Sequence, residues 1–385
     1  MTTPLFVVLP GDIDDPAAPS GGNRYDREVL RRLPPRFPAV REIPVAGSWP
    51  RPGAAASARL ARVLGDLPDG AVVLLDGLVA CGIPDVLEPH AGRLRLAILV
   101  HLPLSDETGL TAGDAAALRA LERRALHLAS AVIATSAQAA AHVERMHDLS
   151  GVHVAPPGVD PAPAAEPSTA GNRLLCVASL THRKGQDVLL QALAQLPDLP
   201  WTCTFAGAGA TPPLPPALDA AVTVASSMAL APGSESSRTI VFAGPLAGAA
   251  LDAAYANADL FVLPSRAETY GMVITEALAR ALPVLATRVG GVPEAVGTAT
   301  GTATGTATGT ATGTATGTAK TEIPGLLIPP DDPAALTTAL RDWLTTPALR
   351  RRWRDAALAR RTTLTGWDDT ATRLAAVLAG LVRNT

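Results

Sequence analysis

Short apolar runs alternate along the chain with longer Ala-, Leu- and Arg-rich stretches of helical character. This alternation is typical of parallel strands that are covered by helices on both faces. In the first part of the chain, we expect a helix at residues 115–128 and strands at residues 5–9, 72–75, 96–100, 132–134 and 152–155. The pattern therefore predicts an α/β fold built on doubly wound parallel sheets.

The alternation is interrupted once and then restarts. Residues 156–173, PPGVDPAPAAEPSTAGNR, are so rich in Pro, Ala and Gly that we interpret them as a linker. Further apolar runs follow: LLCVAS, WTCTFAG, TIVFAG, LFVLPS and PVLATRVGG. A chain of 385 residues exceeds what one core usually supports. We therefore predict two Rossmann-like domains, residues 1–165 and 166–365, with ligands bound beyond the carboxyl ends of their strands.

Composition narrows the class of protein. The net charge of −3 makes duplex nucleic acid an unexpected partner, because proteins that follow phosphate backbones present a basic face. The number of cysteines, three, is odd, and two of them lie inside apolar runs. We therefore interpret them as small core residues of a protein in a reducing compartment. The N-terminus, MTTPLFVVLPGD, lacks a basic segment and a long apolar one. We expect a cytoplasmic protein without a transmembrane segment.

A low-complexity segment breaks the pattern at residues 297–319, where GTAT is repeated five times and followed by GTA. The segment has no large apolar residue whose burial would offset the entropy of ordering it. We interpret it as an unpacked surface insertion. A phosphate-binding loop is the less favoured alternative, because such loops are single turns between a strand and a helix.

Two glutamates flank a glycine in SRAETYGMVITEALARALPV, residues 265–284. Glu268 is expected in the loop after the LFVLPS strand, and Glu276 about one turn into the helix that follows Gly271. The unpaired N–H groups at a helix start attract anions, and the glycine permits a close approach of the ligand. Two carboxylates beside an anion site suit a sugar, a phosphate and a ribose in series. In the alternative, Glu276 is a solvated helix residue and Glu268 only complements the helix dipole.

A second strand-to-helix turn carries cations. In VASLTHRKGQDVLLQAL, Arg183 and Lys184 follow the LLCVAS strand and precede a helix. Together they would neutralise a diphosphate without a metal ion. An ordinary exposed lysine is the alternative for Lys184.

With these two sites the chain resembles the nucleotide-sugar-dependent glycosyltransferases of family 4, retaining enzymes of the GT-B fold. The resemblance extends over nearly the whole chain: PSGGNRYDREV, LVHLPL, ASAVIATS, VHVAPPGVD, RKGQDVLLQAL, VFAGPL, the two-glutamate segment with the following PVLATRVGGVPEAVG, and GLLIPPDDPAAL. It implies two Rossmann-like domains that face each other across a cleft, an N-terminal acceptor domain and a C-terminal donor domain. The last helix, residues 366–385, would pack back on the N-terminal domain.

The resemblance implies roles for individual residues. Glu276 would hold the ribose hydroxyls of the donor, Glu268 the hydroxyls of its sugar, and Lys184 the diphosphate. Many relatives carry an arginine where Ser179 stands, so a second phosphate cation is either missing or supplied by Arg183. Backbone groups would complete the donor site: Tyr270, Gly271, Met272 and Val273 at the sugar and distal phosphate, and Gly244 and Leu246 at the base.

The N-terminal domain would contribute three further residues. His101 ends a buried strand and would point at the donor sugar; a hydrogen-bonded core histidine is the alternative. Gly21 and Gly22 would let the first loop of this domain touch the diphosphate.

The implied reaction transfers a sugar from a nucleoside-diphosphate sugar to a hydroxyl acceptor, with retention of configuration. Catalysis would rest on Glu268, His101 and Lys184, and on electrostatic stabilisation of the leaving diphosphate. We expect neither a cofactor nor a metal ion, since Arg183 and Lys184 would supply the positive charge at the diphosphate. A nucleotide-sugar epimerase and a non-catalytic sugar-nucleotide-binding protein are the alternatives. A dehydrogenase is disfavoured, because no G-x-G-x-x-G follows the first strand.

Overall fold

The computed structural model describes residues 4–15, 20–37, 39–219, 222–225, 238–298 and 322–383. The chain forms two compact units: Met1–Gly158 with Gly366–Thr385, and Val159–Thr365. The predicted N-terminal boundary, residue 165, lies later than this division. Residues after Gly158 are held by the C-terminal unit, where the Ala165 amide donates to the Arg280 carbonyl at 2.8 Å.

A parallel sheet forms the centre of the N-terminal unit, with strand order β2-β1-β3-β4-β5-β6. Its strands are β1 (Leu5–Pro10), β2 (Val40–Val45), β3 (Val72–Asp76), β4 (Arg95–Val100), β5 (Ala131–Ala134) and β6 (His153–Val154). Five of them correspond to predicted strands. The sequence analysis missed β2, because this edge strand, VREIPV, is largely exposed and contains two charges and a proline.

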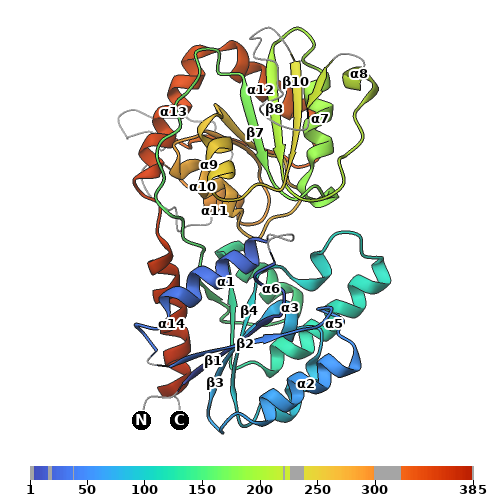
Figure 1. Ribbon diagram of the computed structural model, residues 1–385, viewed down its shortest axis with the longest axis vertical. Helices are drawn as coiled ribbons and strands as arrows, with labels where there is room; N and C mark the ends of the chain where they lie inside the picture. The colour runs from blue at the N-terminus through green and yellow to red at the C-terminus, as the bar shows by residue number, and fades with distance from the viewer. Residues whose placement is uncertain are drawn as a thin grey trace. The chain divides into compact units, whose positions relative to one another are not determined.

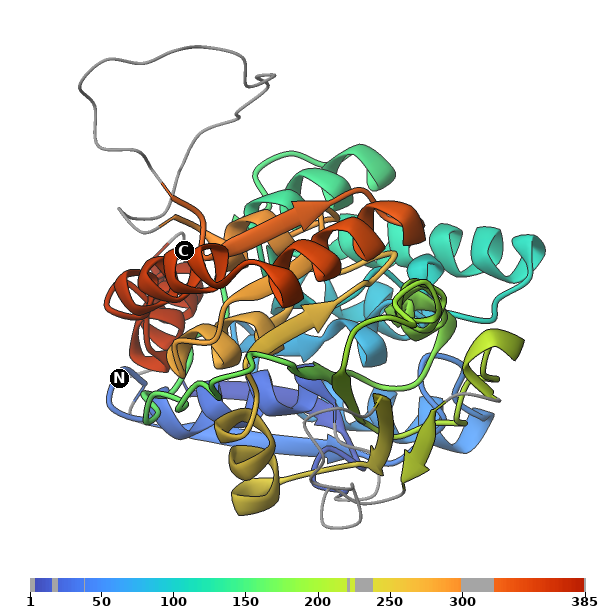
Figure 2. The ribbon, with the colours of Figure 1, turned by 90° about the horizontal axis from the view of Figure 1, so that it is seen from above.

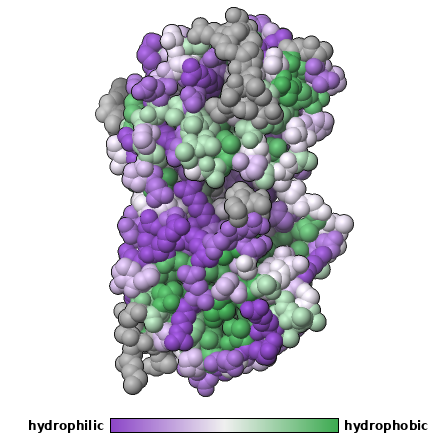
Figure 3. Space-filling view, viewed as in Figure 1, coloured by the Kyte–Doolittle hydropathy of each residue, from purple (hydrophilic) through white to green (hydrophobic). Residues whose placement is uncertain are grey.

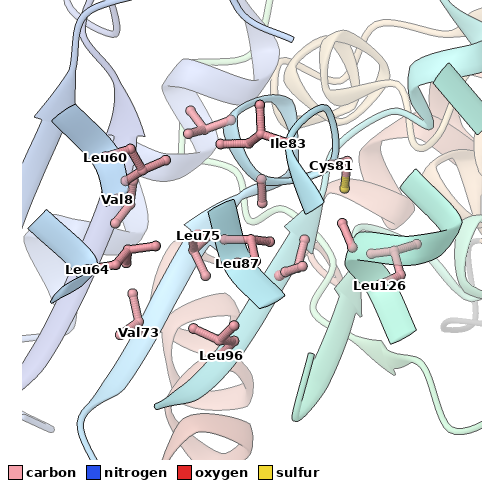
Figure 4. Packing of buried hydrophobic residues seen from close by; sticks show 14 of the residues in the cluster. Val8, Leu60, Leu64, Val73, Leu75, Cys81, Ile83, Leu87, Leu96 and Leu126 are labelled. Carbon is pink, nitrogen blue, oxygen red and sulfur yellow. The ribbon is translucent and has the colours of Figure 1, made fainter. Parts of the chain in front are cut away.

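Helices cover both faces of this sheet, as Figure 1 shows. On one face lie α1 (Gly21–Arg32) and α14 (Trp367–Arg383), which pack together. The other face carries α2 (Ala54–Gly65), the short α3 (Gly77–Ala80) and α4 (Pro84–Leu87), and α5 (Ala112–Leu128), with α6 (Ala137–His147) beside β5 and β6. Figure 4 shows the packing on this second face, where Val8, Val73 and Leu75 of the sheet meet Leu60 and Leu64 of α2.

The helix predicted at 115–128 begins three residues earlier, at Ala112. The Thr111 side chain accepts a hydrogen bond from the Asp114 amide and so caps the first turn.

The C-terminal unit contains a second parallel sheet, with strand order β13-β12-β11-β7-β8-β10-β9. Its strands are β7 (Arg173–Val177), β8 (Trp201–Ala206), β9 (Thr223–Ala225), β10 (Arg238–Gly244), β11 (Leu260–Leu263), β12 (Val284–Thr287) and β13 (Gly325–Ile328). Alternate residues of the central strands enter different cores: Leu174 and Val262 one, Leu175 and Phe261 the other.

These two cores explain the position of the helices. The first core is closed by α7 (Gln186–Ala194) and α12 (Pro333–Thr345), and the second by α9 (Gly248–Ala256), α10 (Met272–Ala279) and α11 (Val292–Val296). The described part of this unit also contains α8 (Pro216–Asp219) and α13 (Pro347–Arg361). Seen from above, helices flank this sheet on both sides (Figure 2).

Each sheet has a point where the strand order reverses. In the N-terminal unit β1 lies between β2 and β3, and in the C-terminal unit β7 lies between β8 and β11. At such a point the loops leave neighbouring strands in opposite directions and open a crevice at the carboxyl edge. The loops after β1, β3, β7 and β11 are therefore the places where a ligand is expected.

Three further predictions concern single segments. Cys81, Cys176 and Cys203 are buried free thiols in the cores, and burial raises the pKa of the Cys176 thiol to about 12. Within the described ranges, no helix is both long and apolar enough to cross a membrane. Apart from its first two residues, the GTAT segment at 297–319 lies outside the described part of the chain.

Candidate active site

An ion pair occupies the reversal point of the C-terminal sheet. Lys184, in the loop after β7, places its Nζ 2.5 Å from Oε1 of Glu268, in the loop after β11. The Ser265 hydroxyl donates to the same carboxylate oxygen at 2.8 Å. Both charged side chains are mostly buried, with 15% of Lys184 and 7% of Glu268 exposed. Lys184 is therefore not the ordinary exposed lysine of the alternative interpretation.

Two glycines allow the loops around the Lys184–Glu268 ion pair to pack closely. Gly185 has a positive φ of 69°, and a Cβ there would lie 2.1 Å from the Pro264 carbonyl oxygen. A Cβ on Gly290 would lie 1.8 Å from the Glu268 carbonyl oxygen, which accepts a hydrogen bond from the Gly291 amide at 3.1 Å. A side chain at Gly185 would force the loops after β7 and β11 apart, and one at Gly290 would push the loop after β12 away from Glu268.

Arg266, which the sequence analysis did not identify, holds the two loops in register. Its guanidinium forms two hydrogen bonds with Asp187, both 2.8 Å long, and one with Asp331 at 2.6 Å. It also donates to the His182 carbonyl at 2.5 Å, and the Arg266 amide donates to the Arg183 carbonyl at 2.8 Å. The Arg266 guanidinium lowers the pKa of Asp187 below its usual value. An arginine after a strand gives no local signal of such a role, because its partners are distant in sequence.

Glu276 lies on α10 and is buried, with 7% of the residue exposed. Its Oε2 accepts a hydrogen bond from the Tyr255 hydroxyl at 2.9 Å. The alternative of a solvated helix residue is therefore wrong. Gly271 begins this helix with a φ of 90°, a conformation that favours glycine. The first amides of α10 follow directly after the Glu268 loop.

Arg183 lies next to Lys184 and has spare donors. One terminal nitrogen donates to the Ala267 carbonyl at 3.3 Å, while the buried Nε has no hydrogen-bond partner among the described residues. Ser179, where the resemblance to family 4 leads us to expect an arginine, is exposed, and its carbonyl accepts a hydrogen bond from the Gln186 amide group at 2.9 Å. Glu268 offsets the charge of Lys184, whereas Arg183 has no carboxylate partner among the described residues.

The other predicted donor contacts are consistent with backbone rather than side-chain roles. The Tyr270 side chain is buried, and burial, with the nearby Glu294 charge, raises the pKa of its hydroxyl to about 12. Met272 and Val273 are half-buried in the first turn of α10. Gly244, with a φ of 68°, ends β10, and Leu246 packs on the second core.

His101 follows β4 in the N-terminal unit and does not stand alone. Its Nε2 lies 2.9 Å from Asp26 Oδ1 of α1, and the edge of the Tyr25 ring packs against the imidazole, 5.1 Å between centroids. Asp76, at the end of β3, brings a third polar group. One side-chain nitrogen or oxygen atom of each of Asp26, Asp76 and His101 lies within 4.8 Å of the others. Asp26 and Asp76 are both 5% exposed. The sequence analysis missed both aspartates.

The three groups shift one another's protonation. Burial lowers the pKa of His101, but the charge and hydrogen bond of Asp26 and the charge of Asp76 outweigh it and raise the pKa to about 9. Burial first, and then the Asp26 charge, raise the pKa of Asp76 to about 7. His101 is therefore an imidazolium at neutral pH. It has the hydrogen-bonded partner that the core-histidine alternative requires, and yet its side chain remains 18% exposed.

Gly21 and Gly22 are placed differently from the prediction. They are the first two residues of α1, capped by Ser20, and do not lie in the preceding loop. A Cβ on Gly22 would come 3.2 Å from the His101 ring, so a small residue is needed here for packing on the histidine. The polar outer face of the same helix is visible in Figure 3, where hydrophilic residues gather over α1.

Comparison with known proteins shows which proteins the chain is similar to. Residues 171–346 match the family model for glycosyl transferases group 1. A D-inositol 3-phosphate glycosyltransferase of Kineococcus radiotolerans is 33% identical over 246 residues, 58% of this chain and 50% of that protein. A GDP-mannose-dependent phosphatidylinositol monomannoside mannosyltransferase of Mycolicibacterium smegmatis is 31% identical over 58% of this chain and 55% of that protein. The chain thus spans about half the length of these two curated relatives.

Solved structures share the fold. Sucrose-phosphate synthase from Thermosynechococcus elongatus matches with a TM-score of 0.68 at 18% identity, over 100% of both chains. Anabaena HepE in complex with UDP-glucose matches with a TM-score of 0.65 at 15% identity, over 98% of this chain and 100% of that one. These comparisons confirm the predicted resemblance to family 4-type glycosyltransferases and the GT-B fold class with two Rossmann-like units.

Proposed function

We propose that this GT-B chain is a retaining glycosyltransferase of family 4, which moves a sugar from a nucleoside-diphosphate sugar to a hydroxyl acceptor. The Lys184–Glu268 ion pair at the reversal point of the C-terminal sheet carries this proposal. A cation and a carboxylate held side by side suit a ligand in which a phosphate adjoins a sugar. The similarity of residues 171–346 to glycosyl transferases supports the same conclusion.

The donor is assigned to the C-terminal unit. In this proposal Lys184 and Arg183 bind the diphosphate, helped by the first amides of α10. Lys184 exchanges its bond to Glu268 for one to phosphate, and this exchange releases the Glu268 carboxylate to accept hydrogen bonds from the sugar hydroxyls. Glu276, already oriented by Tyr255, accepts hydrogen bonds from the ribose.

The base would be held by backbone groups of the loop that includes Gly244 and Leu246. This loop follows β10, which is separated from β7 by β8 alone. Doubly wound sheets bind nucleotides along the edge where the carboxyl ends of their strands lie. Backbone groups in the loops that follow these strands would make the contacts. UDP-glucose, the ligand named for the HepE structure, is therefore a suitable first probe.

The chemistry is dominated by charge on the leaving group. As the glycosidic bond to the diphosphate breaks, negative charge grows on the phosphate oxygens and the sugar becomes oxocarbenium-like. The preorganised cations of the Lys184 loop stabilise the diphosphate more strongly in the transition state than before it. The acceptor hydroxyl attacks the face that the diphosphate leaves and transfers its proton to the leaving diphosphate oxygen, so that no protein nucleophile is needed. His101, as an imidazolium, donates a hydrogen bond to the transferred sugar.

The proposal is tested first by ligand binding. Uridine, guanosine and adenosine diphosphates and their sugar conjugates are compared in a thermal-shift panel. A ligand present at a hundred times its Kd stabilises the protein by about 2.7 kcal/mol. We expect one base to stabilise the protein clearly more than the others.

The second test identifies the reaction. With the preferred donor and a panel of hydroxyl acceptors, NMR of the product should show a new glycosidic bond with the anomeric configuration of the donor. Inversion at the anomeric carbon would contradict the retaining mechanism. Recovery of an isomerised donor without any transferred sugar would favour the epimerase alternative.

A further inference from the structure

Asp26 links His101 to the reversal point of the N-terminal sheet. It lies in the second turn of α1, the helix that follows β1, and Asp76 ends the neighbouring β3. Both strands border the point where the strand order reverses, which is where a doubly wound sheet places its ligands. Asp26 of α1 and Asp76 of β3 thus meet beside His101.

The Asp26 carboxylate is buried, and only one of its two oxygens has a hydrogen-bond partner among the described residues. Its Oδ1 accepts the hydrogen bond from His101 Nε2, while the buried Oδ2 has no partner among the described residues. Asp26 and Asp76 line a small cavity of about 10 Å³ whose other walls are apolar. This volume holds about one water molecule. A carboxylate in such a place is costly unless a nearby cation offsets its charge.

His101 supplies that cation, and its second nitrogen remains available. Its Nε2 is committed to Asp26, whereas Nδ1 has no hydrogen-bond partner in the described ranges. The titratable groups that face the ring are Tyr25 and Asp26 from α1 and Asp76 from β3. Trp367 of α14 packs on Tyr25 and carries no charge.

We propose that Asp26 is a positioning residue for the transferase reaction, which orients the His101 ring and keeps it cationic, so that Nδ1–H is a charged hydrogen-bond donor. The effect of Asp26 on catalysis rests on the proposed function. The interaction between Asp26 and His101 is independent of it. Asp76 strengthens the effect as a second acid beside the ring. The burial of Tyr25 and the absence of a side chain at Gly22 allow α1 to approach His101 closely enough for this contact.

The experiment replaces Asp26 by Asn and follows both protonation and activity. In the wild type, the pKa of His101 is raised to about 9, so the ring stays protonated up to that pH. Without the Asp26 charge, burial lowers the pKa to its usual value of about 6.5 or below. At pH 8 the protonated fraction, and with it kcat, should then fall about thirty-fold, whereas at pH 6 the two proteins should differ by no more than about twofold. The KM for the donor should change little.

The chain provides a matched control. His142 and Asp106 form a similar pair in the same unit, with Nε2 and Oδ2 2.9 Å apart, but His142 is 44% exposed. Asp106→Asn should leave the pH profile of kcat unchanged. Asp26→Glu, which retains the charge, should restore part of the alkaline activity lost in Asp26→Asn.

NMR titration of the histidine rings separates this proposal from the proposed function. The His101 resonance, assigned with His101→Gln, should titrate near pH 9 in the wild type and at least two units lower in Asp26→Asn. This result supports the positioning role even if no sugar transfer is found. Equal titration in both proteins would overturn it. If Asp26→Asn does not fold, Asp26→Ser, which also removes the charge, is used instead, and an unchanged His101 titration there would also overturn the proposal.

Discussion

The Glu276 carboxylate is buried and lies about one turn into α10, the helix that follows Gly271. We expect Glu276→Ala to weaken donor binding by about 1.5 to 3 kcal/mol, the contribution of hydrogen bonds to a charged group. Calorimetric titration with the preferred nucleotide sugar measures this loss. Tyr255→Phe is the control, because it removes the 2.9 Å bond that orients Glu276 and retains the carboxylate. Donor affinity unchanged in Glu276→Ala would contradict the ribose assignment.

Lys184 and Glu268 neutralise each other, so the removal of one leaves the other unpaired in a mostly buried place. Lys184→Met should destabilise the C-terminal unit by up to about 3 kcal/mol, because an uncompensated buried charge is costly. Lys184→Met combined with Glu268→Gln should regain most of that stability and remain inactive. Urea unfolding and a transfer assay measure the two effects. A double variant as active as the wild type would exclude both residues from the reaction.

The loops after β7 and β11 act as a pair because Arg266 joins them. We expect Arg266→Ala to lower donor affinity about tenfold, since Lys184 and Glu268 lose their mutual alignment while neither is changed. Arg266→Lys should recover little, because an ammonium cannot make the two-pronged contact with Asp187. Equilibrium binding of the donor measures the change.

Arg341 offers the matched control for the Arg266 variants. It makes a similar two-pronged contact with Asp198, with distances of 2.6 and 2.9 Å, outside the Lys184 and Glu268 loops. Exposed pairs of this kind contribute about 0 to 1 kcal/mol to stability. Arg341→Ala should therefore leave donor affinity unchanged, and an equal loss in both variants would show that Arg266 acts through general stability alone.

For the whole molecule, the groups around Asp26 predict how stability depends on pH. The pKa of Asp76 is raised to about 7 and that of His101 to about 9. A raised pKa in the folded state stabilises fully below the unfolded value, and this contribution is lost as the pH rises through the folded value. The Asp76 contribution is therefore lost between about pH 4 and 7 and that of His101 between about pH 6.5 and 9.

Scanning calorimetry should accordingly show the Tm of the N-terminal unit falling as the pH is raised from 5 to 9. Asp26→Asn should flatten this dependence, because the Asp26 charge contributes to both raised values. A wild-type Tm that rises over this range would contradict the assignment of these protonation states.

The proposed reaction also predicts an independence from metal ions. Lys184 and Arg183 supply the positive charge at the diphosphate, so transfer should continue in EDTA at an unchanged rate. A complete loss of activity that manganese or magnesium restores would show that a metal ion takes part.

Local sequence patterns determined the fold class and the positions of Glu268 and Glu276 in the candidate site. Apolar runs that alternate with helical stretches specify strands buried on both faces, because only parallel sheets covered by helices bury such runs completely. The order of strand, loop, Gly271 and helix located Glu268 and Glu276 correctly, since these features depend on neighbouring residues. The exposed edge strand β2 lacks this periodicity and was missed for that reason.

Only the tertiary structure decided which side chains meet. Lys184 and Glu268 are 84 positions apart, and they form a 2.5 Å contact because β7 and β11 are neighbours at the reversal point of the sheet. In the same way, the pairing of Asp26 with His101, 75 positions away, depends on how α1 packs over the first sheet. Strand order and helix packing arise from the burial of apolar surface across the whole unit. The residues next to Asp26, Asp76 or Arg266 in the sequence therefore do not indicate which side chains these three will contact.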